Sequence, residues 1–196
     1  QSNAILIRVN ARVDEISDNR IEGSGASGLF VDDHSTVGAM RRNVSRANGR
    51  GLSVLSGSTV ELIEGLTLDE NGVGVEMAIS SRVTSFTGSS ISRNSQTGVQ
   101  VRDGSTIGTF TNNLLVDNAG SGGIALYGGA RIDMQACMVG GSDTQGLFAT
   151  GSGTTVTMTG GSVVNTRRSA PNASDGFGIV VQNGASVTCS GVTLTA

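Results

Sequence analysis

Apolar residues alternate with other residues in eight short segments of this chain, and each segment begins with a small residue. The segment starts are spaced 24, 23, 23, 24, 25, 23 and 32 residues apart. Period-two alternation predicts a strand with one buried face, and a fixed period of this length predicts a solenoid in which each unit packs on its neighbours. The starting residues are Ala4, Gly28, Gly51, Gly74, Gly98, Gly123, Gly146 and Gly178.

Two more strands follow in each unit after polar or glycine-rich turns. The second strand is led by the column Val13, Val37, Val60, Val83, Ile107, Ile132, Val156 and Val187. The third is led by Ile21, Val44, Leu68, Ile91, Leu115, Val139 and Val164. A further column, Ile16, Met40, Ile63, Phe86 and Phe110, predicts an interior ladder with two stacked rings. The sequence therefore predicts an all-β, single-domain parallel β-helix of about eight coils over residues 5–196, with three short strands per coil and right-handed crossovers.

Asparagine, aspartate and cysteine occur at positions that the repeat helps to interpret. Asn48, Asn71, Asn94, Asn118 and Asp143 precede the segment starts, and these residue types tolerate the left-handed backbone of a tight corner. We therefore expect a structural role for them. Cys137 and Cys189 lie two coils apart, or roughly 10 Å at the ~4.8 Å spacing of strands, so we expect two free, buried thiols.

Coils of this length resemble those of the right-handed parallel β-helix in pectate-lyase-like and polygalacturonase-like proteins, over residues 5–196. That superfamily includes polysaccharide lyases, glycoside hydrolases, phage tailspikes, autotransporter passengers and noncatalytic surface proteins. The resemblance thus implies the fold and leaves the function open among these classes.

The charge and hydropathy of the chain limit the classes of partner that we expect for it. All 13 basic residues are arginine and the net charge is −3, which gives no electrostatic footprint for nucleic acid. No apolar run approaches the roughly 18 residues that cross a bilayer, so we expect no membrane insertion. We expect residues 1–4 to be the remnant of an expression tag, and residues 5–196 to be part of a longer protein.

The resemblance implies glycan binding along the outer face of the first sheet. Four polar or aromatic residues occupy outward positions of consecutive coils there: Glu76, Gln100, Arg102 and Tyr127. They form the best candidate site, with Arg102 and Glu76 as catalytic candidates, and the alternative is a solvated face with incidental polar residues. Three further ligand-binding candidates, Arg167, Arg168 and Asp175, belong to the loop in the 32-residue interval and would rim a groove near Tyr127 and Phe148.

Asp32, the remaining ligand-binding candidate, begins the run Asp32-Asp33-His34, which matches part of the polygalacturonase signature. The Gly-His-Gly and Arg-Ile-Lys elements of that signature are missing. Strand geometry places Asp32 about 11 to 12 Å from Glu76, whereas inverting glycosidases hold their carboxyls ~6.5 to 9.5 Å apart. Calcium takes about six or more oxygen ligands, and no pair of coils supplies enough acids. We therefore expect no metal and no cofactor.

Two functions remain open. The first is a noncatalytic, secreted or surface-displayed segment that serves as a rigid scaffold or as a module that recognises a polysaccharide or a cell surface. The second is a carbohydrate-active enzyme, most plausibly a polysaccharide lyase that uses the first-sheet face. Either function predicts an extracellular or cell-surface location. Strand edges at the two ends of a solenoid also predict end-to-end self-association.

Overall fold

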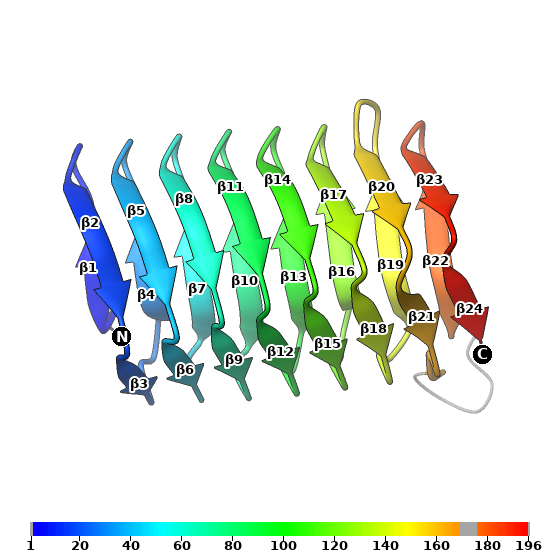
Figure 1. The fold of residues 1–196 in the computed structure, drawn as a ribbon, viewed down its shortest axis with the longest axis horizontal. Helices are drawn as coiled ribbons and strands as arrows, with labels where there is room; N and C mark the ends of the chain where they lie inside the picture. The colour runs from blue at the N-terminus through cyan, green and yellow to red at the C-terminus, as the bar shows by residue number, and fades with distance from the viewer. Residues whose placement is uncertain (1, 169–175, 196) are drawn as a thin grey trace.

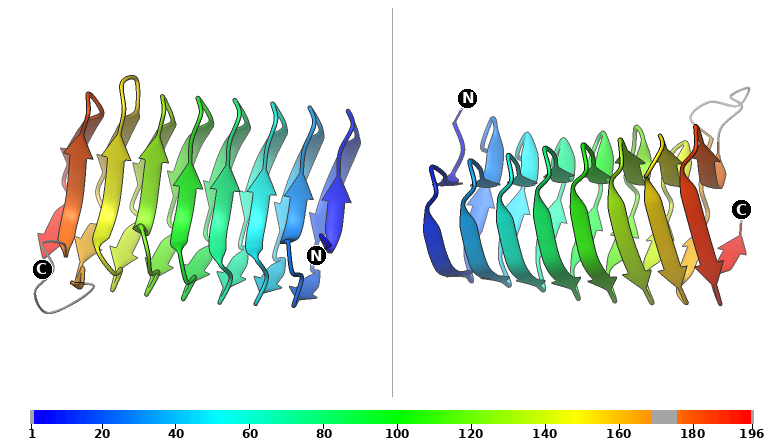
Figure 2. Two further views of the ribbon diagram at one scale, coloured as in Figure 1. Left: turned by 180° about the vertical axis from the view of Figure 1, so that it is seen from behind. Right: turned by 90° about the horizontal axis from the view of Figure 1, so that it is seen from above.

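The computed structural model describes residues 2–168 and 176–195 and contains 24 strands in three parallel sheets. Each coil contributes one strand to each sheet, so eight coils stack along one axis from the N-terminus to the C-terminus (Figure 1). Views from behind and from above show the same stack, and residues 2–168 and 176–195 contain no helix (Figure 2). This confirms the predicted all-β solenoid.

Sheet A contains the strands that begin near the small residues of the repeat. They are β1 (Ile5–Ile7), β4 (Ser27–Val31), β7 (Arg50–Val54), β10 (Val73–Met77), β13 (Thr97–Val101), β16 (Gly122–Tyr127), β19 (Gln145–Thr150) and β22 (Phe177–Gln182).

Sheet B follows each sheet A strand after a tight corner. Its strands are β2 (Arg12–Ser17), β5 (Thr36–Arg41), β8 (Thr59–Glu64), β11 (Arg82–Thr87), β14 (Thr106–Thr111), β17 (Arg131–Gln135), β20 (Thr155–Thr159) and β23 (Ser186–Ser190). Sheet C closes each coil with three-residue strands: β3 (Arg20–Glu22), β6 (Val44–Arg46), β9 (Thr67–Asp69), β12 (Ser90–Ser92), β15 (Leu114–Val116), β18 (Met138–Gly140), β21 (Ser162–Val164) and β24 (Thr193–Thr195).

The interior is filled by ladders of apolar side chains in the predicted register. Leu52 pairs with Val75, and Val75 pairs with Val99. In sheet B, Phe86 pairs with Phe110, and their ring centroids lie 5.1 Å apart in an edge-on arrangement. Such contacts between like side chains on adjacent strands contribute to sheet stability. Because the ladders continue from coil to coil, the core runs the length of the solenoid.

The prediction for the third strand is wrong at two positions. Ser45, rather than Val44, pairs with Ile21 and Leu68, and Val163, rather than Val164, continues the interior column. In a three-residue strand only the middle residue faces inward. The buried hydroxyl of Ser45 is satisfied because it donates to the carbonyl of Gly51 at 2.8 Å, so a polar residue can occupy this interior position.

The asparagines near the corner between sheets C and A are structural, but the expected reason is wrong. Ala47, Glu70 and the other residues just before the asparagines adopt the left-handed backbone, with φ of 53° and 54° for these two. The asparagines themselves are buried and form a continuous ladder. Asn71, for example, donates through its backbone N–H to Oδ1 of Asn94 at 3.0 Å. The ladder runs through Asn48, Asn71, Asn94 and Asn118.

The expectation of two buried thiols is correct for Cys137 and wrong for Cys189. Cys137 is buried and its thiol donates to the carbonyl of Phe110 at 3.0 Å, and burial raises its pKa. Cys189 pairs with Met158 in an interior column of sheet B. It is exposed because no further coil packs on β23 in the described structure.

Candidate functional site

Glycine shapes sheet A so that two positions of each strand share its outer face. A Cβ atom added at Gly74 would lie 2.7 Å from Cγ2 of Ile91 and 2.4 Å from the carbonyl oxygen of Gly98. Pairing skips this glycine, because Val73 and Val75 pair with the neighbouring coil and Gly74 does not. The residue before the glycine and the residue two after it therefore lie on one outer face. The ion pair of Arg50 with Glu76 joins these positions across one coil step.

Glu76 lies at the centre of this outer face and is only 5% exposed. Its Oε1 accepts a hydrogen bond from Nη2 of Arg102 at 2.9 Å, and its Oε2 pairs with Arg50. The two arginine side chains remain 45% and 43% exposed. Three consecutive coils are thus joined by a buried carboxylate between two half-exposed guanidinium groups. Both carboxylate oxygens already have cationic partners, which makes Glu76 a poor general base.

Arg102 offers further donors on this face. Its Nη1 lies 3.7 Å from the carboxylate of Asp103, and its buried Nε has no hydrogen-bond partner among the described residues. A guanidinium group carries five N–H donors in a fixed planar arrangement. The ion pair with Glu76 therefore leaves donors on Arg102 that are able to bind hydroxyl or anionic oxygens.

The outer face continues into an aromatic pair. Gln100 pairs in register with Glu76. Val101 pairs with Leu126, so the residues that follow them, Arg102 and Tyr127, lie next to each other on adjacent coils. The rings of Tyr127 and Phe148 have centroids 5.6 Å apart at 60°. The strands that carry them belong to sheet A, which the left view of Figure 2 shows from outside. We call the set Arg50, Glu76, Gln100, Arg102, Tyr127 and Phe148 the sheet A surface.

Arg167 and Arg168 lie away from the sheet A surface. Arg167 forms ion pairs with Asp143 at 3.1 Å and with Asp117 at 3.3 Å. Asp143 comes just before the first residue of β19, so these ion pairs lie near the start of that strand. Tyr127 is the last residue of β16, so Arg167 lies at the opposite end of the sheet A strands. Arg168 is exposed beside it, and Asp175 lies outside the described residues.

Asp32 follows Val31 as Arg102 follows Val101, so it occupies the same outward column of sheet A as Arg102. It lies two coils before Glu76 and three before Arg102, and is therefore separated from both of them along the solenoid axis. The next two residues, Asp33 and His34, form an exposed pair at 3.4 Å in which both residues have a left-handed backbone. Across residues 2–168 and 176–195, no three His, Cys, Asp or Glu side chains are grouped so that they could hold a metal ion.

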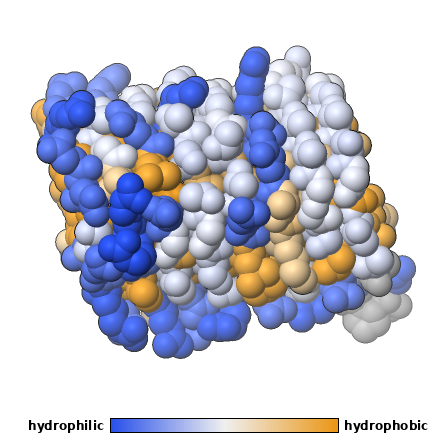
Figure 3. All heavy atoms as spheres, in the orientation of Figure 1, coloured by the Kyte–Doolittle hydropathy of each residue, from blue (hydrophilic) through white to orange (hydrophobic). Residues whose placement is uncertain are grey.

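Ion pairs on the other faces concentrate in the N-terminal coils. Figure 3 shows hydrophilic side chains gathered over these coils, with fewer toward the C-terminus. Arg42 donates from Nε and Nη2 to the carboxylate of Asp18 at 2.8 Å, and hydrogen bonding to Arg42 lowers the pKa of Asp18. Arg46 lowers the pKa of Glu70 in the same way. These pairs link adjacent coils.

Arg50 is the residue of the sheet A surface that the sequence prediction missed. The prediction counted outward positions only after each glycine, whereas Arg50 stands directly before Gly51. The column that precedes the glycines contains Ser27, Arg50, Val73 and Thr97, and its first two members have polar side chains that contact the outward position of the next coil. A polar residue before an inward-facing glycine is the signal that could have found it.

The sequence comparisons agree with this architecture. The family model described as "Right handed beta helix region" matches residues 3–163, so this chain belongs to that family of right-handed β-helix proteins. Searches of curated proteins and of solved structures found no match. Within the described residues, no helix is long and apolar enough to span a membrane.

Proposed function

We propose that this chain is a noncatalytic β-helix module that binds a polysaccharide along the sheet A surface, and that the stacked coils act as a rigid scaffold for that surface. The observation that carries this proposal is the alignment of half-exposed donors and aromatic rings on consecutive coils, from Arg50 to Phe148. At ~4.8 Å per coil, these four steps span about 19 Å, which is the length of a few sugar residues.

The chemistry of the surface suits a glycan. The guanidinium of Arg102 and the amide of Gln100 can hydrogen-bond to hydroxyl groups. Tyr127 and Phe148 present an aromatic pair against which a sugar ring can pack its C–H face. Since polysaccharides are found chiefly outside cells, the proposal includes an extracellular or cell-surface location.

The pairing of Glu76 supports binding without catalysis. A general base must lie within hydrogen-bond reach of the proton that it abstracts. Both oxygens of Glu76 are held by arginines, and its side chain is almost fully buried. The alternative, a polysaccharide lyase with Arg102 at its centre, would require Arg102 to leave Glu76 and lose its proton. This is costly, because a guanidinium group holds its proton more tightly than any other side chain.

A panel of neutral and acidic polysaccharides tests the proposal. Each is incubated with the protein, and size-exclusion chromatography follows both co-elution and glycan length. We expect co-elution without shortening. Tyr127→Ala should reduce it, whereas Thr157→Ala, an exposed change on sheet B, should leave it intact. Retention of no glycan would overturn the proposal. Shortened glycan that Arg102→Ala prevents would establish the lyase instead.

A further inference from the structure

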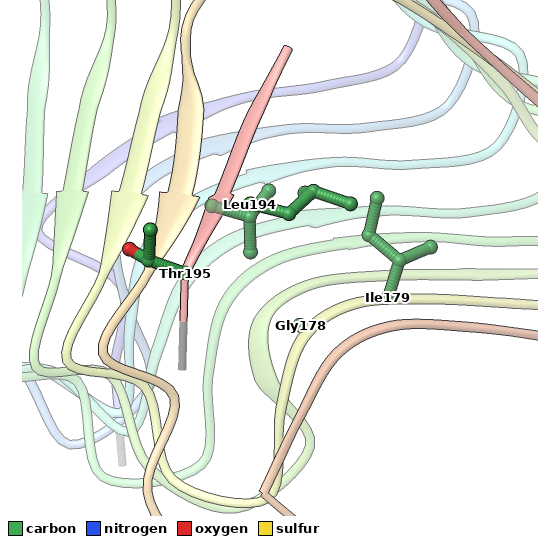
Figure 4. A pocket seen from close by; sticks show the side chains of 5 residues that line it. Gly178, Ile179, Leu194 and Thr195 are labelled. Carbon is green, nitrogen blue, oxygen red and sulfur yellow. The ribbon is translucent and has the colours of Figure 1, made fainter.

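The hollow between β22 and β24 belongs to the interior of the solenoid. Its lining residues are Val163, Gly178, Ile179, Leu194 and Thr195. Figure 4 shows Ile179 and Leu194 extending into it. Ile179 pairs with Leu147 and Leu194 pairs with Val163, so both side chains continue core columns. The outer face of sheet A, in contrast, carries a pattern of side chains that could hold a ligand.

One outward column of sheet A has an aromatic ring at each end and polar side chains at its centre. Register pairing joins its members across six consecutive coils. They are Phe30, Ser53, Glu76, Gln100, Ala125 and Phe148. Ser53, Glu76 and Ala125 are buried, whereas Phe30, Gln100 and Phe148 are partly exposed. A ligand that lies along this column would therefore meet a ring, an amide and a second ring.

The two ends of the column are built alike. Leu55, on the coil after Phe30, is a partly exposed residue at the next outward position. Tyr127, on the coil before Phe148, occupies the equivalent position, and its ring lies 5.6 Å from that of Phe148. Each end thus has a ring in the column and another large side chain one coil closer to the centre. At ~4.8 Å per coil, the five steps from Phe30 to Phe148 span about 24 Å.

The formal charges at the outward positions of these six coils cancel. The positions carry two guanidinium groups, Arg50 and Arg102, and two carboxylates, Asp32 and Glu76. Glu76 pairs with both arginines, and Asp103 lies 3.7 Å from Nη1 of Arg102. An acidic glycan would compete with these carboxylates for the guanidinium groups, whereas hydroxyl groups can accept hydrogen bonds from the remaining donors. The surface therefore favours an uncharged ligand.

We propose that the glycan bound by the sheet A surface is an unbranched, uncharged stretch of polysaccharide that also contacts Phe30. This inference rests on the proposed function and adds the class of glycan and a second aromatic contact. The sugar chain lies along the solenoid axis, with C–H faces packed on the rings at both ends. Hydroxyl groups at its centre bind Gln100 and Arg102.

The charge of the ligand is tested with defined probes, namely neutral β-glucan, xylan and mannan and acidic alginate, hyaluronan and polygalacturonate. We expect only neutral probes to co-elute with the protein. Their Kd should change less than about twofold between roughly 0.05 and 0.5 M salt, because no ion pair forms. Preference for an acidic probe, with a Kd that weakens as salt rises, would overturn this inference and leave the proposed function standing. Retention of no probe would overturn both.

Variants of Phe30 test the second aromatic contact by calorimetry with a retained neutral probe. Phe30→Ala should weaken the Kd roughly tenfold. Phe30→Tyr, which keeps the ring, should bind like the parent, as should Thr157→Ala on sheet B. A Kd that Phe30→Ala leaves unchanged while Tyr127→Ala weakens it would overturn the contact with Phe30 and leave the proposed function standing.

Fragments of the retained probe give a readout on the parent protein that does not depend on any variant. The Kd should tighten with fragment length until the fragment spans about 24 Å, and then stay constant. A Kd that is already constant from the disaccharide onward would contradict a ligand that reaches both rings, even if Phe30→Ala failed to fold.

Discussion

Glu76 of one coil and Arg102 of the next are joined by a 2.9 Å hydrogen bond across the outer face of sheet A. Arg50 completes the arrangement from the preceding coil. The carboxylate is buried although it points away from the core, because the two arginines and the strands beside it cover it. This relationship makes Glu76 a structural anchor for two arginines.

Removal of the Glu76 carboxylate should destabilise the fold. In Glu76→Ala, two guanidinium groups lose their shared counter-charge. Loss of one partner of a fully buried pair costs about 3–5 kcal/mol, and the half-exposed arginines should reduce this to about 2 kcal/mol. Urea unfolding measures the change. Glu61→Ala, at an exposed position of sheet B, is the control and should cost less than about 0.5 kcal/mol. Equal stability of the two variants would contradict the role of Glu76.

The asparagine ladder should contribute strongly to stability. In Asn94→Ala, the side-chain bonds to Leu68 and Asn118 are lost, and Asn71 loses its acceptor. Each buried group left without a partner costs about 1–3 kcal/mol, so we expect a loss of about 3 kcal/mol in the free energy of unfolding. Chemical denaturation is the measurement, with exposed Gln96→Ala as the control. A loss below 1 kcal/mol would mean that the ladder is dispensable.

Replacement of Ile79 should stabilise the protein. Ile79 has φ of 58° and is 58% exposed, so a β-branched side chain occupies a left-handed corner with little burial. The left-handed region costs an ordinary residue about 1–2 kcal/mol, and asparagine tolerates it better. Ile79→Asn should therefore raise stability by about 1 kcal/mol. Ile79→Ala, which keeps a Cβ atom without the tolerance of asparagine, should change it much less. A lower melting temperature for Ile79→Asn would refute the strain.

Acid should weaken the links between coils. Arginine partners lower the folded-state pKa of Asp18 and of Glu70 below their ordinary values of 3.8 and 4.5. The stability from these pairs is present above the ordinary values and is lost as the pH falls through the lowered ones. Thermal melts from about pH 6 down to about pH 2 should thus show a steeper loss below about 4.5 for the parent than for the double variant Asp18→Asn with Glu70→Gln. Parallel curves would show that the pairs contribute nothing.

The sequence predicted the sheets where a regular period fixes the register. Leu52, Val75 and Val99 lie in one column because their strands are long enough for alternation to show which face is buried. Sheet C was harder to predict because its strands have three residues. There the buried Ser45 and the exterior Val44 invert the usual preference, since a serine with a carbonyl partner can occupy the interior.

The candidate site was predicted in part. Glu76, Gln100, Arg102 and Tyr127 do share one outer face, as the alternation in sheet A indicated. The burial of Glu76 and its partner Arg50 could not be predicted by alternation, because the inward-facing glycine changes the count of outward residues. The prediction that Arg167 lies near Tyr127 was wrong. The repeat spacing shows in which coil a residue lies, but it does not show whether its side chain lies near the start or the end of the sheet A strands.

The affinity of the sheet A surface for a glycan tests the account most directly. Isothermal titration calorimetry would use the polysaccharide that co-elutes with the parent and compare it with Tyr127→Ala and Thr157→Ala. Loss of an aromatic contact of about 1.5 kcal/mol corresponds to a roughly tenfold weaker Kd. We predict that weakening for Tyr127→Ala and an unchanged Kd for Thr157→Ala. Equal affinities for the two variants would contradict the binding surface.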